Sequence, residues 1–470
     1  MERDALRLLI PVHSGTWFVE LRRVARLCQS TRRHRPILLF TVDYPQRTRD
    51  VSACLAEGIT CLDENGVLLG PDILRPPRRR NVWAAPLRVW TLLARVGPFR
   101  VVQSVLEVRE RLRFARRVIA TVKPALLVLA GDNVGYDTAC FIRAAQDHGL
   151  RTVLVPSTMS NGQEEAEVYS KSPRHLVRGG LNALAAALYP RWARQHKDRV
   201  VLRVPGERVL AYEFLGIAPP RPWSFNSGFA AAIAVESASM RRYYLDCGLP
   251  PERLVDTGSL ANDELAEAMR DRAPRRAALC RELELTPEVP ILLSALPPDF
   301  LYLDGGRPEC DFARYEDLVA FWMSTVASVQ HFNRVVCLHP SMAVADWRHL
   351  EGRYDVRIST EPTSALIPLC DLYVASVSST IRWAIACAVP VVNYDVYRYR
   401  YEDFAGVPGV VAVEEQGGFA EALRRFDTDA PFRESMRAQV GSVSESWGHL
   451  DAQAGSRLLA LFDQLAVRPT

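Results

Sequence analysis

Lysine is almost missing from this chain of 470 residues: it occurs at Lys123, Lys171 and Lys197, and every other basic residue is arginine. The formal net charge is +4, so the chain as a whole lacks the charge excess of a nucleic-acid binder. Ten cysteines are present, but none form a CxxC pair or a zinc-ligand spacing. This cysteine usage favours a reducing, cytoplasmic setting.

Long apolar runs are missing too. No uncharged apolar stretch is long enough to cross a bilayer, and the opening MERDALRLLIPV shows no signal-peptide pattern. We identify no Asp-x-Asp pair that would chelate a metal ion, and we predict neither a metal nor a cofactor. Residues 75–97 and 174–195 are basic and apolar and contain tryptophan. They fit either interfacial helices on anionic lipid or core helices with a solvated arginine face, so a peripheral location at the inner membrane stays open.

Short apolar runs alternate with helical patterns in both halves of the chain. Strand-like runs occupy 7–15, 124–133 and 151–157, and a second series begins near residue 288. This alternation is typical of βαβ units around a parallel sheet. We predict an α/β protein with two Rossmann-like, doubly wound domains that face a cleft. The expected ranges are 1–260 and 261–445, followed by a helix in 446–470 that crosses back to the first domain.

Three consecutive hydroxyls, Ser378, Ser379 and Thr380, follow the apolar run DLYVA and precede a helical pattern. A strand–turn–helix unit presents free backbone N–H groups and the positive end of the helix dipole at its turn. Phosphate is the natural anion for such a site. One hydroxyl would suffice as an N-cap, so capping by Ser379 or Thr380 is the alternative.

His339 ends another apolar run, and Pro340 stops the strand there. Because ligands bind beyond the carboxyl ends of parallel strands, this imidazole is a candidate to donate to a phosphate or to protonate a leaving group. His13 ends the first strand in the same way and is a candidate second base. A backbone-bonded, structural histidine is the alternative for both.

Carboxylates also follow the strands of the first half. Asp132 comes directly after Gly131 and is a candidate base or nucleophile, with helix capping as the alternative. Glu164 and Glu165 lie after the next strand and are acceptor-side candidates, or else part of a first helical turn. The stretch NYDVYRYRYEDF, residues 393–404, offers tyrosines and arginines to a polar, anionic ligand or is a surface loop.

Several of these motifs resemble those of GT-B-type glycosyltransferases, a layout shared by UDP-N-acetylglucosamine 2-epimerases and CDP-glycerol transferases. VLAGDNVGYDTACFIRAAQDHGLRTVLVPS resembles the strand–GD–helix–strand unit of the first domain, and HLDAQAGSRLLALF the C-terminal helix that crosses back. LVDTGSLANDEL is similar to the interdomain TGSxxxD connection, which makes Ser259 a donor-side candidate.

His339–Pro340 followed by Ser378–Ser379 resembles the HP and SS motifs of bacterial sialyltransferases, polysialyltransferases and Kdo transferases, in which these residues hold the phosphate of a CMP-activated sugar. The stretch TIRWAIACAV lacks the ribose-binding glutamate of the UDP-sugar enzymes. The acidic D/E-D/E-G motif of the sialyltransferases has no clean counterpart, and Asp132–Asn133 is the nearest. The remaining donor-side candidates are Thr380 and Ser294.

The resemblance implies a metal-independent glycosyltransferase that carries an acidic sugar, Kdo or a sialic-acid relative, from CMP to a bacterial surface glycan such as a capsule or lipopolysaccharide. The implied partners are the CMP-sugar donor and a glycan or lipid-linked glycan acceptor. A CDP-glycerol or polyol phosphotransferase, a 2-epimerase-like isomerase and a catalytically silent binding protein remain as alternatives.

Overall fold

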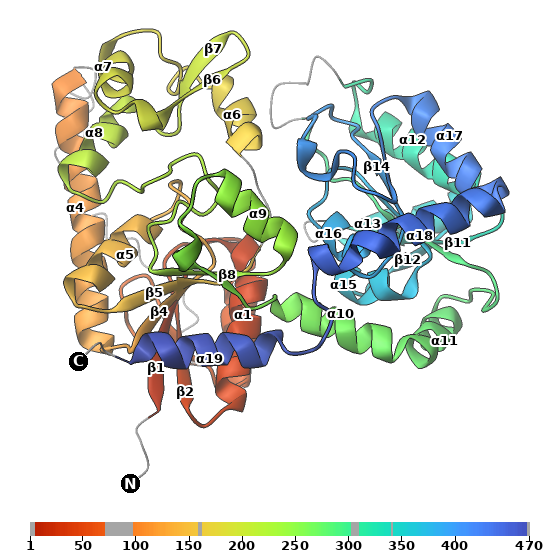
Figure 1. The fold of residues 1–470 in the computed structure, drawn as a ribbon, viewed down its shortest axis with the longest axis horizontal. Coiled ribbons are helices and arrows are strands. Elements are labelled where there is room, and N and C mark those ends of the chain that lie inside the picture. Colours follow the sequence, from red (N-terminus) through yellow and green to blue (C-terminus); the bar gives the residue numbers. More distant parts are fainter. Residues whose placement is uncertain (1–4, 71–96, 158–161, 302–309, 340–341, 468–470) are drawn as a thin grey trace. The chain divides into compact units, whose positions relative to one another are not determined.

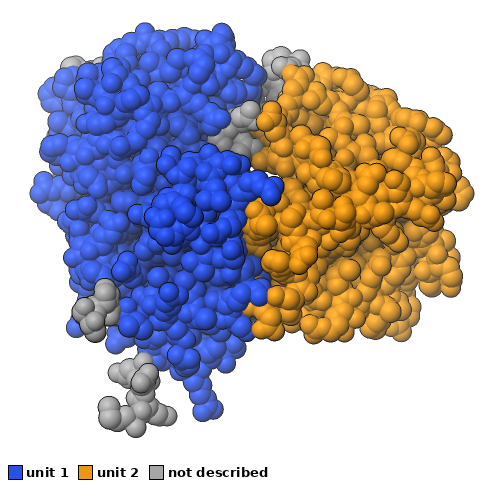
Figure 2. All heavy atoms as spheres, viewed as in Figure 1, with its two compact units in different colours: residues 1–235, 241–260, 455–470 blue, residues 236–240, 261–454 orange. Residues whose placement is uncertain are grey.

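The computed structural model describes residues 5–70, 97–157, 162–301, 310–339 and 342–467. The chain divides into two compact units (Figures 1 and 2). Unit 1 takes residues 1–235, 241–260 and 455–470, and unit 2 takes residues 236–240 and 261–454. After residue 260 the chain continues in unit 2, and it returns to unit 1 at Gly455.

Unit 1 is built on a seven-stranded parallel sheet with the order β3-β2-β1-β4-β5-β8-β9. Its central strands are apolar on both faces because helices cover both sides, which is what a parallel sheet requires. The strands are β1 (Leu6–Val12), β2 (His34–Phe40), β3 (Thr60–Leu62), β4 (Leu126–Leu129), β5 (Arg151–Leu154), β8 (Ala232–Val235) and β9 (Leu254–Asp256).

The helices of the first 260 residues connect these strands, and an antiparallel pair of strands is added outside the sheet. Ser14 caps the first helix by accepting a hydrogen bond from the backbone N–H of Thr16. The elements are α1 (Gly15–Ser30), α2 (Arg47–Ala56), α4 (Gly97–Val122), α5 (Thr138–Asp147), α6 (Gly162–Ser170), α7 (Gly180–Leu188), α8 (Gly206–Phe214), α9 (Ala238–Asp246), β6 (Ala193–His196) and β7 (Arg199–Leu202). The next helix, α10 (Leu260–Arg270), follows β9 and belongs to unit 2 from Ala261 on.

Unit 2 contains a six-stranded parallel sheet with the order β12-β11-β10-β13-β14-β15. Its elements are β10 (Ile291–Ala295), β11 (Asn333–Cys337), β12 (Arg357–Ser359), β13 (Leu372–Ala375), β14 (Val391–Tyr394), β15 (Val410–Val413), α11 (Arg272–Glu282), α12 (Tyr315–Ala327), α13 (Val344–Trp347), α14 (His349–Tyr354), α15 (Thr363–Leu366), α16 (Ile381–Ala386), α17 (Gln416–Thr428) and α18 (Ala430–Trp447).

The final helix, α19 (Ala454–Ala466), belongs to unit 1 (Figure 1). Leu458, Leu461 and Phe462 are at most 4% exposed and join the core cluster that contains the side chains of β1 and β2. Burying three such side chains removes enough apolar surface from water to stabilise the docked helix by about 1.5–3 kcal/mol each. The last segment of the chain is therefore an integral part of the first unit.

The predicted fold class, α/β with two doubly wound parallel-sheet domains, is confirmed. The sequence patterns did not predict the 26-residue helix α4 or the β6–β7 pair. The basic segment 75–97 lies almost wholly outside the described residues, and 174–195 contains α7, the turns around it and the start of β6. No helix in the described ranges has an apolar stretch long enough to cross a membrane.

Candidate functional site

Each sheet reverses its strand order at one point, and the predicted site residues follow the strands there. In unit 1 the reversal lies between β1 and β4, and in unit 2 between β10 and β13. In doubly wound sheets ligands bind beyond the carboxyl ends of the strands at such a switch point. In unit 1, His13 follows β1 and Asp132 follows β4. In unit 2, the turn that contains Ser378 and Ser379 follows β13.

The serine turn, residues 376–380, is half-buried throughout. The hydroxyl of Thr380 lies 2.5 Å from the Tyr373 hydroxyl and 2.7 Å from that of Ser378. Ser378 also accepts a hydrogen bond from the Thr380 N–H at 3.3 Å. Thr380 is the N-cap residue of α16, yet its side chain makes no capping bond, so capping by this hydroxyl is not what the structure shows.

Two features of the turn are unusual, a strained backbone and a buried hydroxyl without a partner among the described residues. Val377 has φ = +43°, a left-handed conformation that is strained for a β-branched residue and costs on the order of 1–3 kcal/mol. Its N–H is held by the side-chain oxygen of Asn393 at 2.9 Å. The hydroxyl of Ser376 is buried and has no hydrogen-bond partner among the described residues. Backbone strain and an unsatisfied buried hydroxyl together are typical of a ligand-binding turn.

A buried ion pair follows the turn. Arg382, in α16, is 4% exposed and Glu236 is 6% exposed, with Nε and Oε1 3.3 Å apart. Burial raises the pKa of Glu236, and the nearby guanidinium opposes that rise. Nε and Nη1 of Arg382 have no hydrogen-bond partner in the described part of the chain. The turn is therefore accompanied by a desolvated cation with unused donors.

His339 lies just beyond β11 and is exposed. The surrounding protein partly desolvates its imidazole and lowers the pKa of His339. β11 and β13 flank β10, so their ends are two strand spacings, about 10 Å, apart. His339 and the serine turn thus lie at the same edge of the sheet. Pro340 lies outside the described residues.

His13 is 3% exposed, and its ring packs edge-on against Phe141. Nδ1 lies 2.9 Å from the Thr41 hydroxyl, whereas Nε2 is buried without a partner in the described ranges. Burial lowers the pKa of His13 to about 4, so the ring is neutral at pH 7. A neutral imidazole with one unused nitrogen can act as a base, and this role stays a prediction.

Asp132 has a structural set of contacts. It is 2% exposed, and its carboxylate accepts bonds from the N–H of Ser227 at 2.5 Å, the Ser227 hydroxyl at 2.8 Å and the N–H of Phe229 at 2.9 Å. Burial raises the pKa of Asp132, although these donors stabilise the charge. The carboxylate therefore anchors the loop before β8, and its catalytic role remains a prediction that these contacts do not favour.

Glu165 is brought next to Asn133 by an arginine that the sequence analysis missed. Arg203 is 1% exposed and pairs with Glu165, while its Nη2 also donates to the Asn133 side-chain oxygen at 2.6 Å. Burial raises the pKa of Glu165. Glu165 Oε2 and Arg203 Nη1 are buried without partners among the described residues. Of Glu164, only the backbone in α6 is described.

Two of the donor-side candidates, Ser294 and Ser259, are buried. Ser294 is fully buried, and its hydroxyl accepts the indole N–H of Trp322 at 2.8 Å in the core of unit 2. Ser259 is 3% exposed. Burial does not favour contact with a donor, and the donor-side role of both serines stays a prediction.

One Asp-x-Asp pair does exist, at Asp427 and Asp429, but both carboxylates are structural. Asp427 accepts bonds from the backbone N–H groups of Gln330 and His331 at 3.0 and 2.7 Å, and Asp429 caps α18 by accepting the N–H of Phe432. No group of three or more His, Cys, Asp or Glu side chains in the described ranges is arranged to hold a metal ion.

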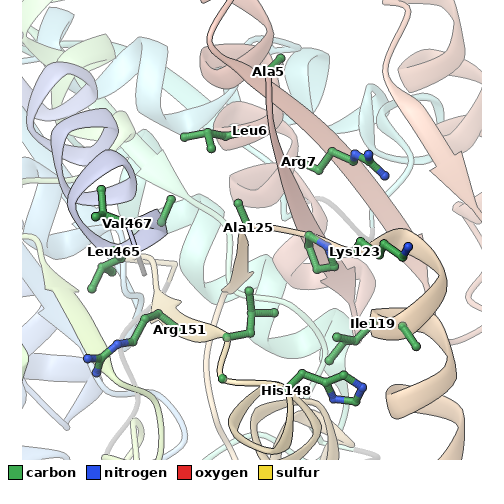
Figure 3. A pocket seen from close by; sticks show the side chains of 15 residues that line it. Ala5, Leu6, Arg7, Ile119, Lys123, Ala125, His148, Arg151, Leu465 and Val467 are labelled. Carbon is green, nitrogen blue, oxygen red and sulfur yellow. The ribbon is translucent and has the colours of Figure 1, made fainter. Parts of the chain in front are cut away.

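A cavity of about 550 Å³ opens at the opposite edge of the unit 1 sheet, at the amino ends of β1, β4 and β5 (Figure 3). Arg7, Lys123 and Arg151 lie around it, together with the end of α19. Arg7 donates to the carbonyl of Val122 at 2.9 Å, at the end of α4. Cations here complement the negative end of a helix dipole, so we assign them a structural role.

The residues that the sequence analysis missed share one signal. Arg203, Glu236 and Arg382 each stand next to an apolar stretch, where a charge needs a partner to be buried. The sequence shows each charged residue but not its partner, which lies far along the chain. Arg203 pairs with Glu165, and Glu236 pairs with Arg382, 146 positions away.

No family model and no curated protein matches this chain. Among solved structures, the UDP-GlcNAc 2-epimerase of Neisseria meningitidis bound to UDP-GlcNAc is 11% identical with a TM-score of 0.53 and covers 98% of this chain and 100% of its own. The wall teichoic acid polymerase TagF is 10% identical, with a TM-score of 0.53 and coverage of 99% and 89%. A calicheamicin glycosyltransferase is 13% identical, with a TM-score of 0.54 and coverage of 99% and 100%. At these identities the likeness establishes the fold: the chain has the two-domain architecture of GT-B glycosyltransferases and 2-epimerases.

Proposed function

We propose that the chain is a glycosyltransferase that moves an acidic sugar, of the Kdo or sialic-acid kind, from a CMP-activated donor to a growing bacterial surface glycan. The observation that carries the proposal is the serine turn at the switch point of unit 2. The turn combines a strained Val377 with a Ser376 hydroxyl that has no partner among the described residues, and the desolvated guanidinium of Arg382 follows it in α16.

These groups fit the charge that develops during the reaction. When the bond between the anomeric carbon and the phosphate oxygen breaks, the electron pair stays on the phosphate. Fixed N–H, O–H and guanidinium donors stabilise that charge without reorganising, which is the most effective form of electrostatic catalysis. His339 adds a donor at the same sheet edge, about 10 Å away, a distance that a nucleotide can span.

On the acceptor side, unit 1 contributes a base. Nε2 of His13, which has no partner within the described ranges, accepts the proton of the attacking hydroxyl, and Glu165 with Arg203 provides polar contacts for the acceptor. His13 equally favours the second candidate function, a CDP-polyol phosphotransferase, because that reaction also requires a histidine base.

Nucleotide binding separates these functions. Thermal shifts and calorimetry with CMP, CDP and UDP test the donor class, and mass spectrometry of products from CMP-Kdo, CMP-sialic acid and CDP-glycerol tests the reaction. We expect CMP to stabilise the protein and a CMP-sugar to give the product. Stabilisation by UDP alone would overturn the proposal in favour of the 2-epimerase type, and turnover of CDP-glycerol alone in favour of the phosphotransferase.

We also propose peripheral contact with an anionic membrane through one face of α4. Phe99, Val102 and Leu106 are 40–51% exposed, and exposed Arg109 and Arg113 continue the same stripe at intervals of three and four residues. Apolar side chains in line with arginines suit an interfacial helix.

Co-sedimentation with vesicles of phosphatidylcholine and phosphatidylglycerol tests this contact. We expect Leu106→Glu to reduce binding and the same change at Leu245, an apolar residue of α9 that is 40% exposed, to leave it unchanged. Equal binding of wild type and Leu106→Glu would show that this face is not the membrane contact.

A further inference from the structure

A second cavity in unit 1, of about 500 Å³, lies outside the residues assigned above. Val134 and Gly135, in the loop after β4, line one side of it. The rest of the lining comes from α4, from α8 with the two residues before it, and from Arg174 and His175. The cavity is therefore at the carboxyl end of β4, the edge of the sheet where ligands of doubly wound domains bind.

Glu207 contributes a buried, hydrogen-bonded carboxylate to the lining of this cavity. The residue is 5% exposed, and its Oε1 accepts a hydrogen bond from Arg100 at 2.8 Å, with Arg174 3.6 Å away. Its Oε2 is buried and has no hydrogen-bond partner among the described residues. Leaving a buried acceptor unpaired destabilises the protein, and a donor group on a ligand would remove that penalty.

His175 supplies a second acceptor. Its Nδ1 lies 3.0 Å from the carbonyl of Leu202, and a carbonyl can only accept, so Nδ1 carries the proton. Burial lowers the pKa of His175, which keeps the ring neutral and leaves Nε2 as an acceptor. One face of the ring stacks on Tyr169, with ring centres 4.4 Å apart.

The lining carries three arginines and two glutamates, so it has one positive charge in excess. Two acceptors, Glu207 and His175, call for a ligand with several O–H donors, and the arginines favour a ligand that is also anionic. A nucleotide base fits poorly: Tyr212 is 2% exposed and the His175 ring is stacked on Tyr169. A hydroxylated saccharide with carboxylate or phosphate groups meets all these requirements.

We propose that the cavity between α4 and α8 binds an acidic saccharide and forms a subsite for the glycan acceptor. The assignment as an acceptor subsite rests on the proposed glycosyl transfer, whereas the saccharide class rests on the contacts of Glu207 and His175.

Isothermal titration calorimetry tests the proposal with two probes, an α2,8-linked tetramer of N-acetylneuraminic acid and the uncharged maltotetraose. We expect the acidic tetramer to bind more tightly than maltotetraose and Glu207→Gln to weaken it at least tenfold. The matched control is Glu57→Gln, which alters another unit 1 carboxylate paired with two arginines, Arg22 and Arg26. This control should bind like wild type.

Ser104→Phe provides a second variant if Glu207→Gln does not fold, because Ser104 lines the cavity on α4 and a phenyl ring would fill it. Absence of tetramer binding to wild type, equal affinity for maltotetraose, or full affinity in the folded variants would each overturn the inference. CMP titrations keep the two proposals apart. If CMP binds and the tetramer does not, only the proposed subsite is contradicted. If the tetramer binds and CMP does not, only the proposed CMP-sugar donor is contradicted.

Discussion

Nδ1 of His13 and the hydroxyl of Thr41 are 2.9 Å apart, and the geometry around them assigns the tautomer of the ring. The Thr41 hydroxyl donates its proton to the carbonyl of Val12 at 3.0 Å, so towards His13 it can only accept. Nδ1 therefore carries the imidazole proton. Nε2, which has no partner in the part of the chain that the structure describes, keeps its lone pair, as a base requires.

The buried His13 should make the protein sensitive to acid. Its pKa is about 4 in the folded state against 6.5 for the free side chain. Between these values the unfolded chain binds a proton that the folded protein does not, so stability is lost as pH falls from 6.5 to 4. The full difference corresponds to about 3 kcal/mol. Denaturant unfolding from pH 7 to 4 should show this loss in wild type and a smaller one in His13→Gln.

The control for this change is His148→Gln, which replaces an exposed imidazole of the same unit. It should leave the pH dependence of unfolding as in wild type. Identical curves for wild type and His13→Gln would show that the imidazole of His13 is accessible to protons in the folded state.

The serine turn should carry donor affinity. Replacing both Ser378 and Ser379 by alanine removes two hydroxyls, each worth about 1 kcal/mol as a hydrogen bond and more towards a charged phosphate. We expect CMP affinity to fall by at least tenfold in calorimetry with the fold intact. Ser294→Ala makes the same chemical change at a buried serine and should leave CMP affinity unchanged. Unaltered affinity in the double variant would mean that the phosphate binds elsewhere.

The strands and their order of appearance were predictable because both faces of a parallel sheet are buried. Runs such as LRLLIPV and DLYVA are therefore apolar almost without interruption. The turn after β13 was predictable because three consecutive hydroxyl residues end the apolar run of that strand. α4 was not, because Val102 and Leu106 on its exposed face blur the helical period of its buried side chains.

The contacts of the candidate site were less predictable than its positions. Asp132 and Ser294 stand where ligand-binding residues stand in such folds, yet both turn inward to partners distant in sequence, Ser227 and Trp322. A single sequence gives the place of a side chain along a strand. It does not give the long-range partner that decides whether a polar group is structural or free.

The Asp132 carboxylate should act mainly on stability. In Asp132→Asn one oxygen becomes an NH₂ group, which faces donors of Ser227 and Phe229 instead of accepting from them. We expect a loss of about 1–3 kcal/mol in the free energy of unfolding, the usual cost of a buried unsatisfied group. kcat should fall by less than tenfold at a temperature where the variant is folded. A fall of two or more orders of magnitude with unchanged stability would establish a catalytic carboxylate instead.

His339 should act as a neutral hydrogen-bond donor to the departing phosphate. Partial desolvation lowers the pKa of His339, so the ring is uncharged at pH 7 and one N–H remains to donate. His339→Ala removes that donor, and we expect kcat to fall by about two orders of magnitude, within the range of single electrostatic contacts in catalysis. His339→Gln keeps an N–H donor and should recover part of the loss.

The pH profile distinguishes this role from proton transfer. A neutral donor gives a kcat that stays level from pH 6.5 to 8. A general acid with this lowered pKa gives a kcat that falls as pH rises through that range, because the protonated form disappears. Steady-state kinetics with the CMP-sugar donor over this range, on wild type and His339→Gln, measures both. Level kcat with partial recovery in the glutamine variant supports the neutral donor, whereas equal loss in both variants together with a falling wild-type profile assigns His339 as the acid.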